Sequence, residues 1–230
     1  PKNKDWLDVS VHTVKRTKKS LLLISRCGVL KLTPVEESII RVQFRKGTDI
    51  RFRKGYWEYE PEQPVKWTAR AGKKLVEMAT ERISVIVDKG SGALQFFAKN
   101  GNRLLAERPD QPRRIEASVS FETWNYFDWA KGEKISAKGI LAEDLQRMNQ
   151  KARYISFGGG KMRMPLLLSE YGYGIGTAAE RTVMCCMVPM YGNYVYTDGA
   201  DQIDYYFLYG GDRKQTLNLY YKITGKPPRE

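Results

Sequence analysis

Short runs of β-branched, aliphatic and aromatic residues recur along the first half of the chain, and turn-forming residues separate them. Runs of about four to eight such residues between Gly, Pro and Asp are typical of β-strands. The pattern predicts strands over residues 21–27, 29–33, 38–44, 74–78, 83–88 and 94–97. Residues 89–92 and 99–102 are predicted hairpin turns, because Gly and Asn tolerate the positive φ angles that tight turns require.

A second group of elements is predicted between residues 161 and 225. The continuous apolar run at 166–168 lies between Pro165 and the glycines Gly172 and Gly174, which is typical of a strand buried on both faces. Glycines at these positions permit a sharp return of the chain or a close approach of two backbones. Residues 201–209 are rich in aromatic and β-branched residues, so they are a predicted strand as well.

One short helix is expected after residue 210, where the apolar period changes. Asp212 and Gln215 have the spacing of a capping box, and Gly225 is placed to end the helix. Three apolar residues share one face of this helix: Leu217, Tyr220 and Tyr221.

Many short strands and one late helix predict an all-β, mostly antiparallel β-sandwich with a short C-terminal helix. All-β units of about 230 residues are often single domains, and 42% hydrophobic residues supply a sizeable core. We therefore expect one sandwich domain over residues 1–225, with 226–230 beginning a linker.

The middle of the chain contains a dense aromatic segment, in which five of nine residues are aromatic: Phe121, Trp124, Tyr126, Phe127 and Trp129. Aromatic faces stack on sugar rings, but large aromatics also dominate ordinary cores. The aromatics do not alternate cleanly, which favours packing or a domain contact. Sugar stacking by Trp124 and Trp129 is the alternative that we keep.

The order of motifs in the second half resembles a known family. A proline-led apolar strand is followed by Ser-x-x-Gly-Tyr-Gly at 169–174, by Ile-Asp-Tyr-Tyr-Phe-Leu-Tyr-Gly at 203–210, by a short helix, and by Tyr-x-x-x-x-Gly-x-Pro-Pro at 220–228. This order is similar to the end of the N-terminal β-sandwich domain of glycoside hydrolase family 31, the α-glucosidases and α-xylosidases. The resemblance implies a mutarotase-like supersandwich whose Pro-Pro exit leads into a catalytic (β/α)₈ barrel.

The resemblance also implies where the chemistry lies. Retaining glycosidases use two carboxyl groups roughly 5–5.5 Å apart, and in this family both belong to the barrel. We therefore expect a non-catalytic domain that packs on its own barrel and helps to shape outer sugar subsites. The parent enzyme would act on an oligosaccharide or α-glycoside.

A polar loop or turn is predicted at residues 144–154, just before the proline-led strand. The resemblance implies that this region reaches over the barrel mouth, although the family's Gly-Leu-Gly-Glu is missing here. Asn149, Gln150, Lys151 and Arg153 are the candidates to meet sugar hydroxyls, with surface solvation as their alternative role.

Other chemistries lack their motifs. His12 is the only histidine, in a Val-His-Thr-Val strand pattern, and no Gly-x-Ser-x-Gly elbow accompanies it. The Cys and His spacing of a zinc site is missing, and the Gly-Gly-Gly-Lys at 158–161 lacks the spacing of a phosphate loop. We expect no catalytic residue, metal or cofactor in this chain.

The net charge of +13 permits an acidic partner, but the basic residues are scattered. The cluster at residues 15–19 lies between two predicted strands, so a solvated hairpin loop is expected and a nucleic-acid partner is not. No run approaches the roughly 20 apolar residues of a membrane span. Cys27, Cys185 and Cys186 form no disulfide pattern, which favours the cytoplasm.

Two other function classes remain open. The aromatic segment favours a free-standing carbohydrate-binding module, whereas a Pro-Pro exit into another domain does not. An aldose-epimerase-like enzyme shares the expected fold but needs histidine and acid partners for proton transfer, and one histidine makes it the weaker alternative. If a barrel packs on this domain, part of segment 124–129 and the helix face with Leu217, Tyr220 and Tyr221 should be exposed here.

Overall fold

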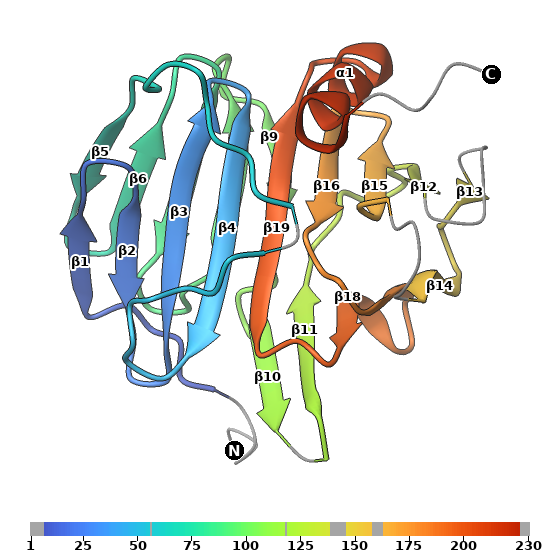
Figure 1. Ribbon diagram of the computed structural model, residues 1–230, viewed down its shortest axis with the longest axis horizontal. Coiled ribbons are helices and arrows are strands. Elements are labelled where there is room, and N and C mark those ends of the chain that lie inside the picture. The colour runs from blue at the N-terminus through green and yellow to red at the C-terminus, as the bar shows by residue number, and fades with distance from the viewer. Residues whose placement is uncertain (1–6, 56, 118, 139–145, 158–162, 226–230) are drawn as a thin grey trace.

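The computed structural model describes residues 7–55, 57–117, 119–138, 146–157 and 163–225. They form one nine-stranded sheet that is faced by two five-stranded sheets, and every strand pairing is antiparallel (Figure 1). The predicted all-β sandwich is therefore confirmed. The Gly-Gly-Gly-Lys segment at 158–161 and the Pro-Pro at 227–228 lie outside the described residues.

The nine-stranded sheet, here the large sheet, draws its strands from both ends of the chain. In spatial order its strands are β1 (Thr13–Arg16), β2 (Leu21–Ile24), β3 (Gly28–Glu36), β4 (Ile39–Lys46), β19 (Gln202–Tyr209), β16 (Tyr173–Thr177), β15 (Leu166–Ser169), β12 (Ile135–Lys138) and β13 (Gln146–Arg147). The N-terminal strands thus meet the C-terminal strands at the β4–β19 pair, which joins the two halves of the sandwich.

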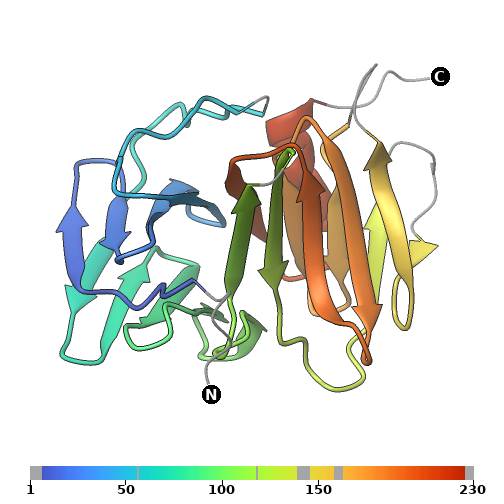
Figure 2. The ribbon, with the colours of Figure 1, turned by 90° about the horizontal axis from the view of Figure 1, so that it is seen from below.

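The two smaller sheets pack against the inner face of the large sheet (Figure 2). The β7 sheet contains β5 (Thr68–Ala71), β6 (Leu75–Ala79), β7 (Ile83–Asp88), β8 (Leu94–Ala98) and β9 (Arg103–Ala106), in that order. The β11 sheet contains, in spatial order, β10 (Arg113–Ala117), β11 (Phe121–Tyr126), β18 (Gly192–Asp198), β17 (Thr182–Val188) and β14 (Ala152–Phe157). One continuous apolar core lies between these sheets and the large sheet.

The predicted strands of the first half are confirmed, with ends that differ by a few residues. One difference concerns Cys27, which the pattern placed in a strand. Strand β2 ends at Ile24, and Ser25 turns the chain: its hydroxyl donates to the carbonyl oxygen of Gly28 at 2.8 Å. Cys27 is therefore a half-buried turn residue, whereas Cys185 and Cys186 are buried in β17.

The predicted turns are confirmed as well. Residues 89–92 join β7 to β8, and residues 99–102 join β8 to β9, with Gly92 at φ +70° and Gly101 at φ +86°. The basic residues 15–19 lie at the β1–β2 hairpin, as expected of a solvated loop.

The proline-led strand is β15, and all of its residues are buried. Gly172 returns the chain at φ +76°, and Gly174 lies inside β16, where an added Cβ would be 3.0 Å from Leu166 Cδ1. Gly172 combines the two expected roles, a sharp return and a close backbone approach, because an added Cβ there would also lie 2.2 Å from Gly211 C. Strands β17 and β18 follow β16 in sequence but belong to the other layer, which the sequence pattern did not reveal.

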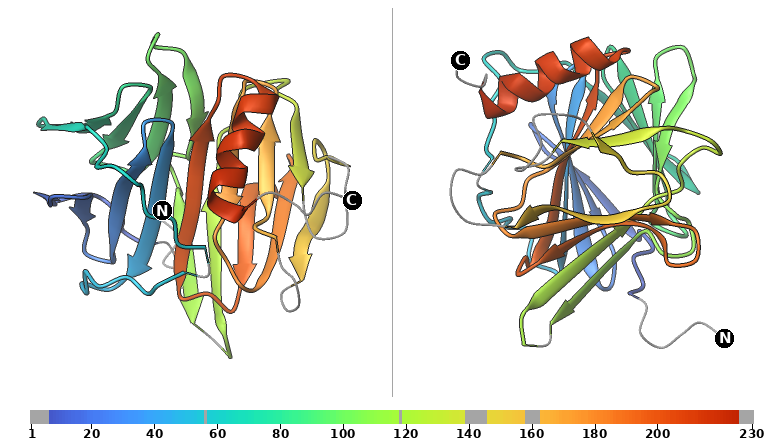
Figure 3. Two further views of the ribbon diagram at one scale, coloured as in Figure 1. Left: turned by 45° about the horizontal axis from the view of Figure 1, so that its top comes forward. Right: turned by 90° about the vertical axis from the view of Figure 1, so that its right-hand side faces the viewer.

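Helix α1 (Arg213–Thr224) lies on the outer face of the large sheet, against β16 and β19 (Figure 3). Asp212 Oδ1 accepts a hydrogen bond from Gln215 N at 2.8 Å, which confirms the predicted cap. Tyr220 is 1% exposed and donates to Met164 O at 2.8 Å. The expectation of one exposed helix face is therefore wrong for Tyr220, while Leu217 and Tyr221 are half-buried.

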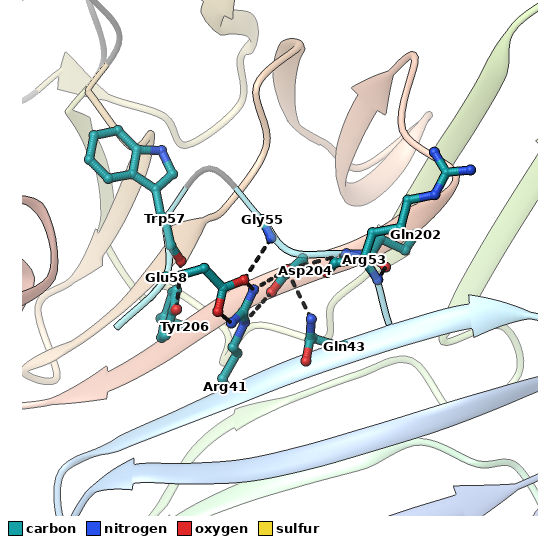
Figure 4. Close-up of polar contacts among 9 residues, drawn as sticks. All are labelled: Arg41, Gln43, Arg53, Gly55, Trp57, Glu58, Gln202, Asp204 and Tyr206. Atoms are coloured by element: carbon teal, nitrogen blue, oxygen red, sulfur yellow. Dashed lines mark hydrogen bonds and ion pairs between the residues drawn. The ribbon is translucent and has the colours of Figure 1, made fainter. Parts of the chain in front are cut away.

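An ion-pair network holds the long connection after β4 against the outer face of the large sheet (Figure 4). Arg41 on β4 donates to both carboxylate oxygens of Asp204 on β19 and, at 2.7 and 2.8 Å, to both oxygens of Glu58. Glu58 Oε1 also accepts from Gly55 N at 2.6 Å. Gly55 and Glu58 are thereby held at the β4–β19 junction.

Candidate functional site

Strand β11 has an inverted pattern of polar and apolar residues. Thr123 and Asn125 face the interior and are 2% and 4% exposed, whereas Trp124 between them faces outward and is half-buried. Residues 121–126 are thus a regular strand, and the lack of clean apolar alternation in the sequence has a physical cause. The larger aromatic ring lies on the outer face and the small polar groups lie on the inner face.

Strand β18 has the same inversion and pairs with β11. Thr197 lies opposite Thr123 on the inner side, and Tyr196 lies opposite Trp124 on the outer side. The Trp124 and Tyr196 rings are 5.2 Å apart. On the same side of the two strands, the ring of Tyr126 lies 5.6 Å from that of Tyr194, but Tyr126 is only 8% exposed. Two adjacent strands therefore present aromatic rings to the same face.

The register extends this arrangement across all five strands of the β11 sheet. One residue from each strand lies in a single cross-strand row, here called the aromatic row: Arg114, Trp124, Tyr196, Met184 and Tyr154. Neighbouring strands are about 4.8 Å apart, so Trp124 and Tyr154, three strands apart, are separated by about 14 Å. The row therefore crosses all five strands of the sheet.

Polar contacts fix the orientation of the rings. The guanidinium of Arg114 lies 4.8 Å from the Trp124 ring centroid, and Tyr196 Oη donates to Glu122 Oε1 at 2.6 Å. Partial burial and this bond to Glu122 raise the pKa of Tyr196. Tyr154 at the far end is 55% exposed. Arginine, tyrosine hydroxyls and ring faces are together suited to a ligand with both C–H faces and hydroxyls.

Asn149 is part of the structural framework at the β13–β14 turn. Its Oδ1 accepts from Ile135 N at 3.1 Å, and its Nδ2 donates to Glu133 O at 2.6 Å. Both ends of its amide are therefore used within the chain. A role in meeting sugar hydroxyls remains a hypothesis for this residue.

Gln150, Lys151 and Arg153 are exposed. Gln150 is in the turn at φ +61°, and its backbone N–H donates to Met187 O at 3.0 Å. The predicted loop or turn at 144–154 is right for 149–150 but wrong for 146–147 and 152–154, which are strand residues. Residues 144–145 lie outside the described residues. Arg153 and Tyr154 lie on β14, the edge strand of the sheet that contains Trp124, so the structure brings these two parts together.

Trp129 is not on the aromatic row. It is 8% exposed, and its ring lies 5.2 Å from that of Phe127 inside the core. Of the two tryptophans that the sequence suggested, Trp124 alone presents a ring to the outer face. Tyr154, Tyr196 and Arg114 were missed by sequence reasoning. The Tyr-Val-Tyr sequence of β18 is a local signal for a strand with aromatic residues on one face. The position of Tyr196 beside Trp124, however, depends on the order of strands in the sheet.

Other reactive groups are dispersed. His12 is exposed just before β1, and its ring nitrogen Nδ1 is 2.9 Å from Thr13 Oγ1. Burial raises the pKa of the Cys185 thiol, so it is an inert core residue. Within the described ranges, no group of three or more His, Cys, Asp or Glu residues could hold a metal ion. Among the described residues, no helix is long and apolar enough to cross a membrane.

No protein-family model matches this chain. Among curated proteins, the isomaltosyltransferase of Sporosarcina globispora is 26% identical over 174 residues, which is 65% of this chain and 16% of that enzyme. The chain therefore spans less than a fifth of the length of the curated relative that it matches.

Solved structures match over most of the chain. The glycoside hydrolase family 31 dextranase of Flavobacterium johnsoniae has a TM-score of 0.78 at 17% identity and covers 96% of this chain and 28% of its own. The family 31 α-xylosidase from a soil metagenome has a TM-score of 0.72 at 16% identity, covering 86% and 32%. The cycloalternan-forming enzyme of Listeria monocytogenes has a TM-score of 0.73 at 16% identity, covering 94% and 22%. The resemblance predicted from the sequence is confirmed at the level of the fold.

Proposed function

We propose that residues 1–225 form a non-catalytic N-terminal β-sandwich domain of a glycoside hydrolase family 31 enzyme. The observation that carries this proposal is the unequal coverage of the fold match. The match covers 96% of this chain but only 28% of the dextranase chain. A unit of that size is a part of a larger enzyme in the matched protein. Residues 226–230 would then begin the linker to a catalytic barrel.

The parent enzyme is proposed to act on α-glucosidic or α-xylosidic bonds. The matched proteins are described as a dextranase, an α-xylosidase and a cycloalternan-forming enzyme, and two of them are seen with isomaltotriose and with a pentasaccharide substrate. An α-linked oligosaccharide is accordingly the proposed partner of the whole protein, together with its own barrel.

Helix α1 is the proposed contact with the barrel. Leu217 and Tyr221 are half-buried and line a shallow groove with Arg213, Lys214 and Asn218. Apolar side chains in an open groove beside the end of the described chain are suited to cover by a neighbouring domain. Fixing the sandwich there would let it position loops at the outer sugar subsites.

The aromatic row supports a second role for the same domain, the binding of a glycan outside the catalytic centre. A free-standing carbohydrate-binding module would use the same face. Asn149, Gln150, Lys151 and Arg153 remain candidates for hydroxyl contacts near the β14 edge. We propose no nucleic-acid or membrane partner, on the support of the scattered basic residues, and a cytoplasmic location, on the support of three cysteines that are all free thiols.

Comparing this chain with the full-length product of its gene tests the proposal. Release of nitrophenol from nitrophenyl α-glucoside and α-xyloside should occur with the full-length product, whereas the chain alone should show none. The non-catalytic assignment would be refuted if the chain alone hydrolyses these substrates and keeps this activity after repurification has removed contaminating enzymes. A full-length product without a barrel would favour the free-standing module.

A further inference from the structure

Basic residues that are far apart in the sequence come together at one end of the sandwich, where β4 ends and β19 begins (Figure 1). Four segments meet there: residues 25–27 between β2 and β3, residues 46–54 from the end of β4 onward, residues 178–181 between β16 and β17, and residues 199–201 between β18 and β19. Their six basic residues are all exposed and are here called the basic end: Arg26, Lys46, Arg51, Arg53, Lys54 and Arg181.

The first two segments lie side by side. Gly47 N, directly after β4, donates to Cys27 O at 2.9 Å. Arg26 therefore lies beside the end of β4. Strand β19 begins at the same place, because Gln202 is opposite Arg45 in the pairing of β4 with β19.

Side chains of β4 and β19 hold the backbone of the connection that follows β4. Arg45 Nη1 donates to Arg51 O at 2.6 Å. Arg53 N donates to Gln202 Oε1 at 3.3 Å, and Gln202 Nε2 donates to Arg53 O at 3.4 Å (Figure 4). The side chains of Arg51 and Arg53 are nevertheless 88% and 68% exposed. The backbone is thus held while both guanidinium groups stay accessible, so a partner that binds them orders little additional chain.

The other layer contributes Arg181. Its side chain lies over Gly199, where an added Cβ would be 3.3 Å from Arg181 Cδ. Arg181 lines a cavity of about 220 Å³ between the two layers together with Arg53 and Lys54. Sites for drug-sized ligands measure about 300–1,000 Å³, so a larger partner lies across these residues and not within the cavity.

The basic end has an excess of positive charge. The four segments contain three acidic residues besides the six basic ones, and two of the acids are already paired: Asp49 with Arg51 at 3.1 Å and Asp201 with Arg53 at 3.0 Å. Within the part of the chain that the structure describes, four of the six basic residues have no ion-pair partner: Arg26, Lys46, Lys54 and Arg181. Charges of one sign that lie together repel one another, so this excess favours an anionic partner.

Four of the six basic residues are arginines, whose planar guanidinium groups match carboxylates in two parallel hydrogen bonds. Because the six exposed side chains belong to both layers, they suit an extended partner with several negative charges. The choice of a glycan as this partner rests on the proposed function of the domain. We propose that the basic end binds an acidic oligosaccharide, whose carboxylates pair with these guanidinium and ammonium groups.

Two double variants that remove the same charge from opposite ends of β2 offer a matched test. Lys54→Gln with Arg181→Gln removes two unpaired charges from the basic end, whereas Lys18→Gln with Lys19→Gln removes two from the exposed β1–β2 hairpin. An oligogalacturonate, with one carboxylate on each sugar unit, is titrated against the chain by isothermal calorimetry. We expect the first double variant to bind about fivefold more weakly than the wild type and the second to bind as the wild type does. Binding should also weaken as salt is added, because salt screens exposed charges.

The proposal is overturned if oligogalacturonate does not bind or if the two double variants lose affinity equally, since the charge would then act without a site. Tighter binding of single-stranded DNA than of oligogalacturonate would equally reject the acidic glycan. Hydrolysis of nitrophenyl glycosides by the full-length product tests the proposed function separately. Hydrolysis without oligogalacturonate binding rejects the basic end alone, whereas binding without hydrolysis rejects the glycosidase assignment alone.

Discussion

Arg41 and Asp204 form a buried, two-bond ion pair that joins the first four strands to the last one. Arg41 Nε is 2.9 Å from Asp204 Oδ1, and Arg41 Nη2 is 2.7 Å from Asp204 Oδ2. The two side chains are 8% and 4% exposed. Two residues that are 163 positions apart in sequence thus form a bidentate ion pair between β4 and β19. The bidentate geometry makes the interaction directional as well as stabilising.

Removing the acidic partner should strongly destabilise the fold. Asp204→Ala leaves the Arg41 charge buried with Glu58 as its remaining carboxylate, so we expect the free energy of unfolding to fall by about 3–5 kcal/mol. The ion pair between Asp201 and Arg53, whose side chain is 68% exposed, is the control, and Arg53→Ala should cost less than about 1 kcal/mol. Urea unfolding measures both. Similar losses for the two variants would contradict the assignment of the Arg41 pair as a structural joint.

The turn at Gly172 offers a second test, with Gly211 as its matched control. Both have positive φ, at +76° and +87°, but a Cβ at Gly172 would lie 2.2 Å from Gly211 C, whereas a Cβ at Gly211 meets nothing within 4 Å. Gly211→Ala should lose about 1–2 kcal/mol for its left-handed backbone. Gly172→Ala should lose about 3–5 kcal/mol, because backbone overlap adds to the same strain. Equal losses in chemical denaturation would show that the close approach does not matter.

Stability should also depend on the ionisation of Glu58. Burial would raise its pKa, but hydrogen bonds from Arg41 and from Gly55 N outweigh this effect and lower the pKa below its usual value. A carboxyl with a lowered folded-state pKa stabilises the protein above its unfolded pKa, near 4.3, and loses that contribution as pH falls through the folded value. We expect the stability difference between the wild type and Glu58→Gln to be constant from pH 7 to about pH 5 and to shrink below it. A difference that grows on acidification would reverse the assigned sign.

The parts of the fold that sequence reasoning predicted are those with local causes. The hairpin turns follow from Gly92 and Gly101, and the helix start follows from Asp212 and Gln215, all of which act within a few residues. The buried strand β15 follows from an uninterrupted apolar run. These signals need no knowledge of the rest of the chain.

The candidate site was harder to predict because its causes are not local. The usual rule that apolar residues face the core fails for β11, where Thr123 and Asn125 face inward and Trp124 faces outward. The aromatic row also depends on sheet order: Tyr154 and Trp124 are placed on one face by the intervening strands β17 and β18. Asn149 looked like a free polar side chain in the sequence, but the structure uses it to hold β12 in place.

The aromatic row should bind an α-linked oligosaccharide, and Trp124 should contribute most because it has the largest ring. With isomaltotriose as the probe, we expect Trp124→Ala to weaken binding by about tenfold or more, which corresponds to about 1.4 kcal/mol or more. Tyr196→Ala should weaken it as well. Tryptophan fluorescence and isothermal calorimetry measure the affinity of the wild type and the variants.

Trp67→Ala is the matched control, because Trp67 also lies under an arginine, with the Arg16 guanidinium 4.4 Å from its ring centroid, but packs near the β1 edge. This variant should bind isomaltotriose as the wild type does. If Trp124→Ala and Trp67→Ala bind equally well, the outward aromatics are packing residues for another domain and not a glycan platform.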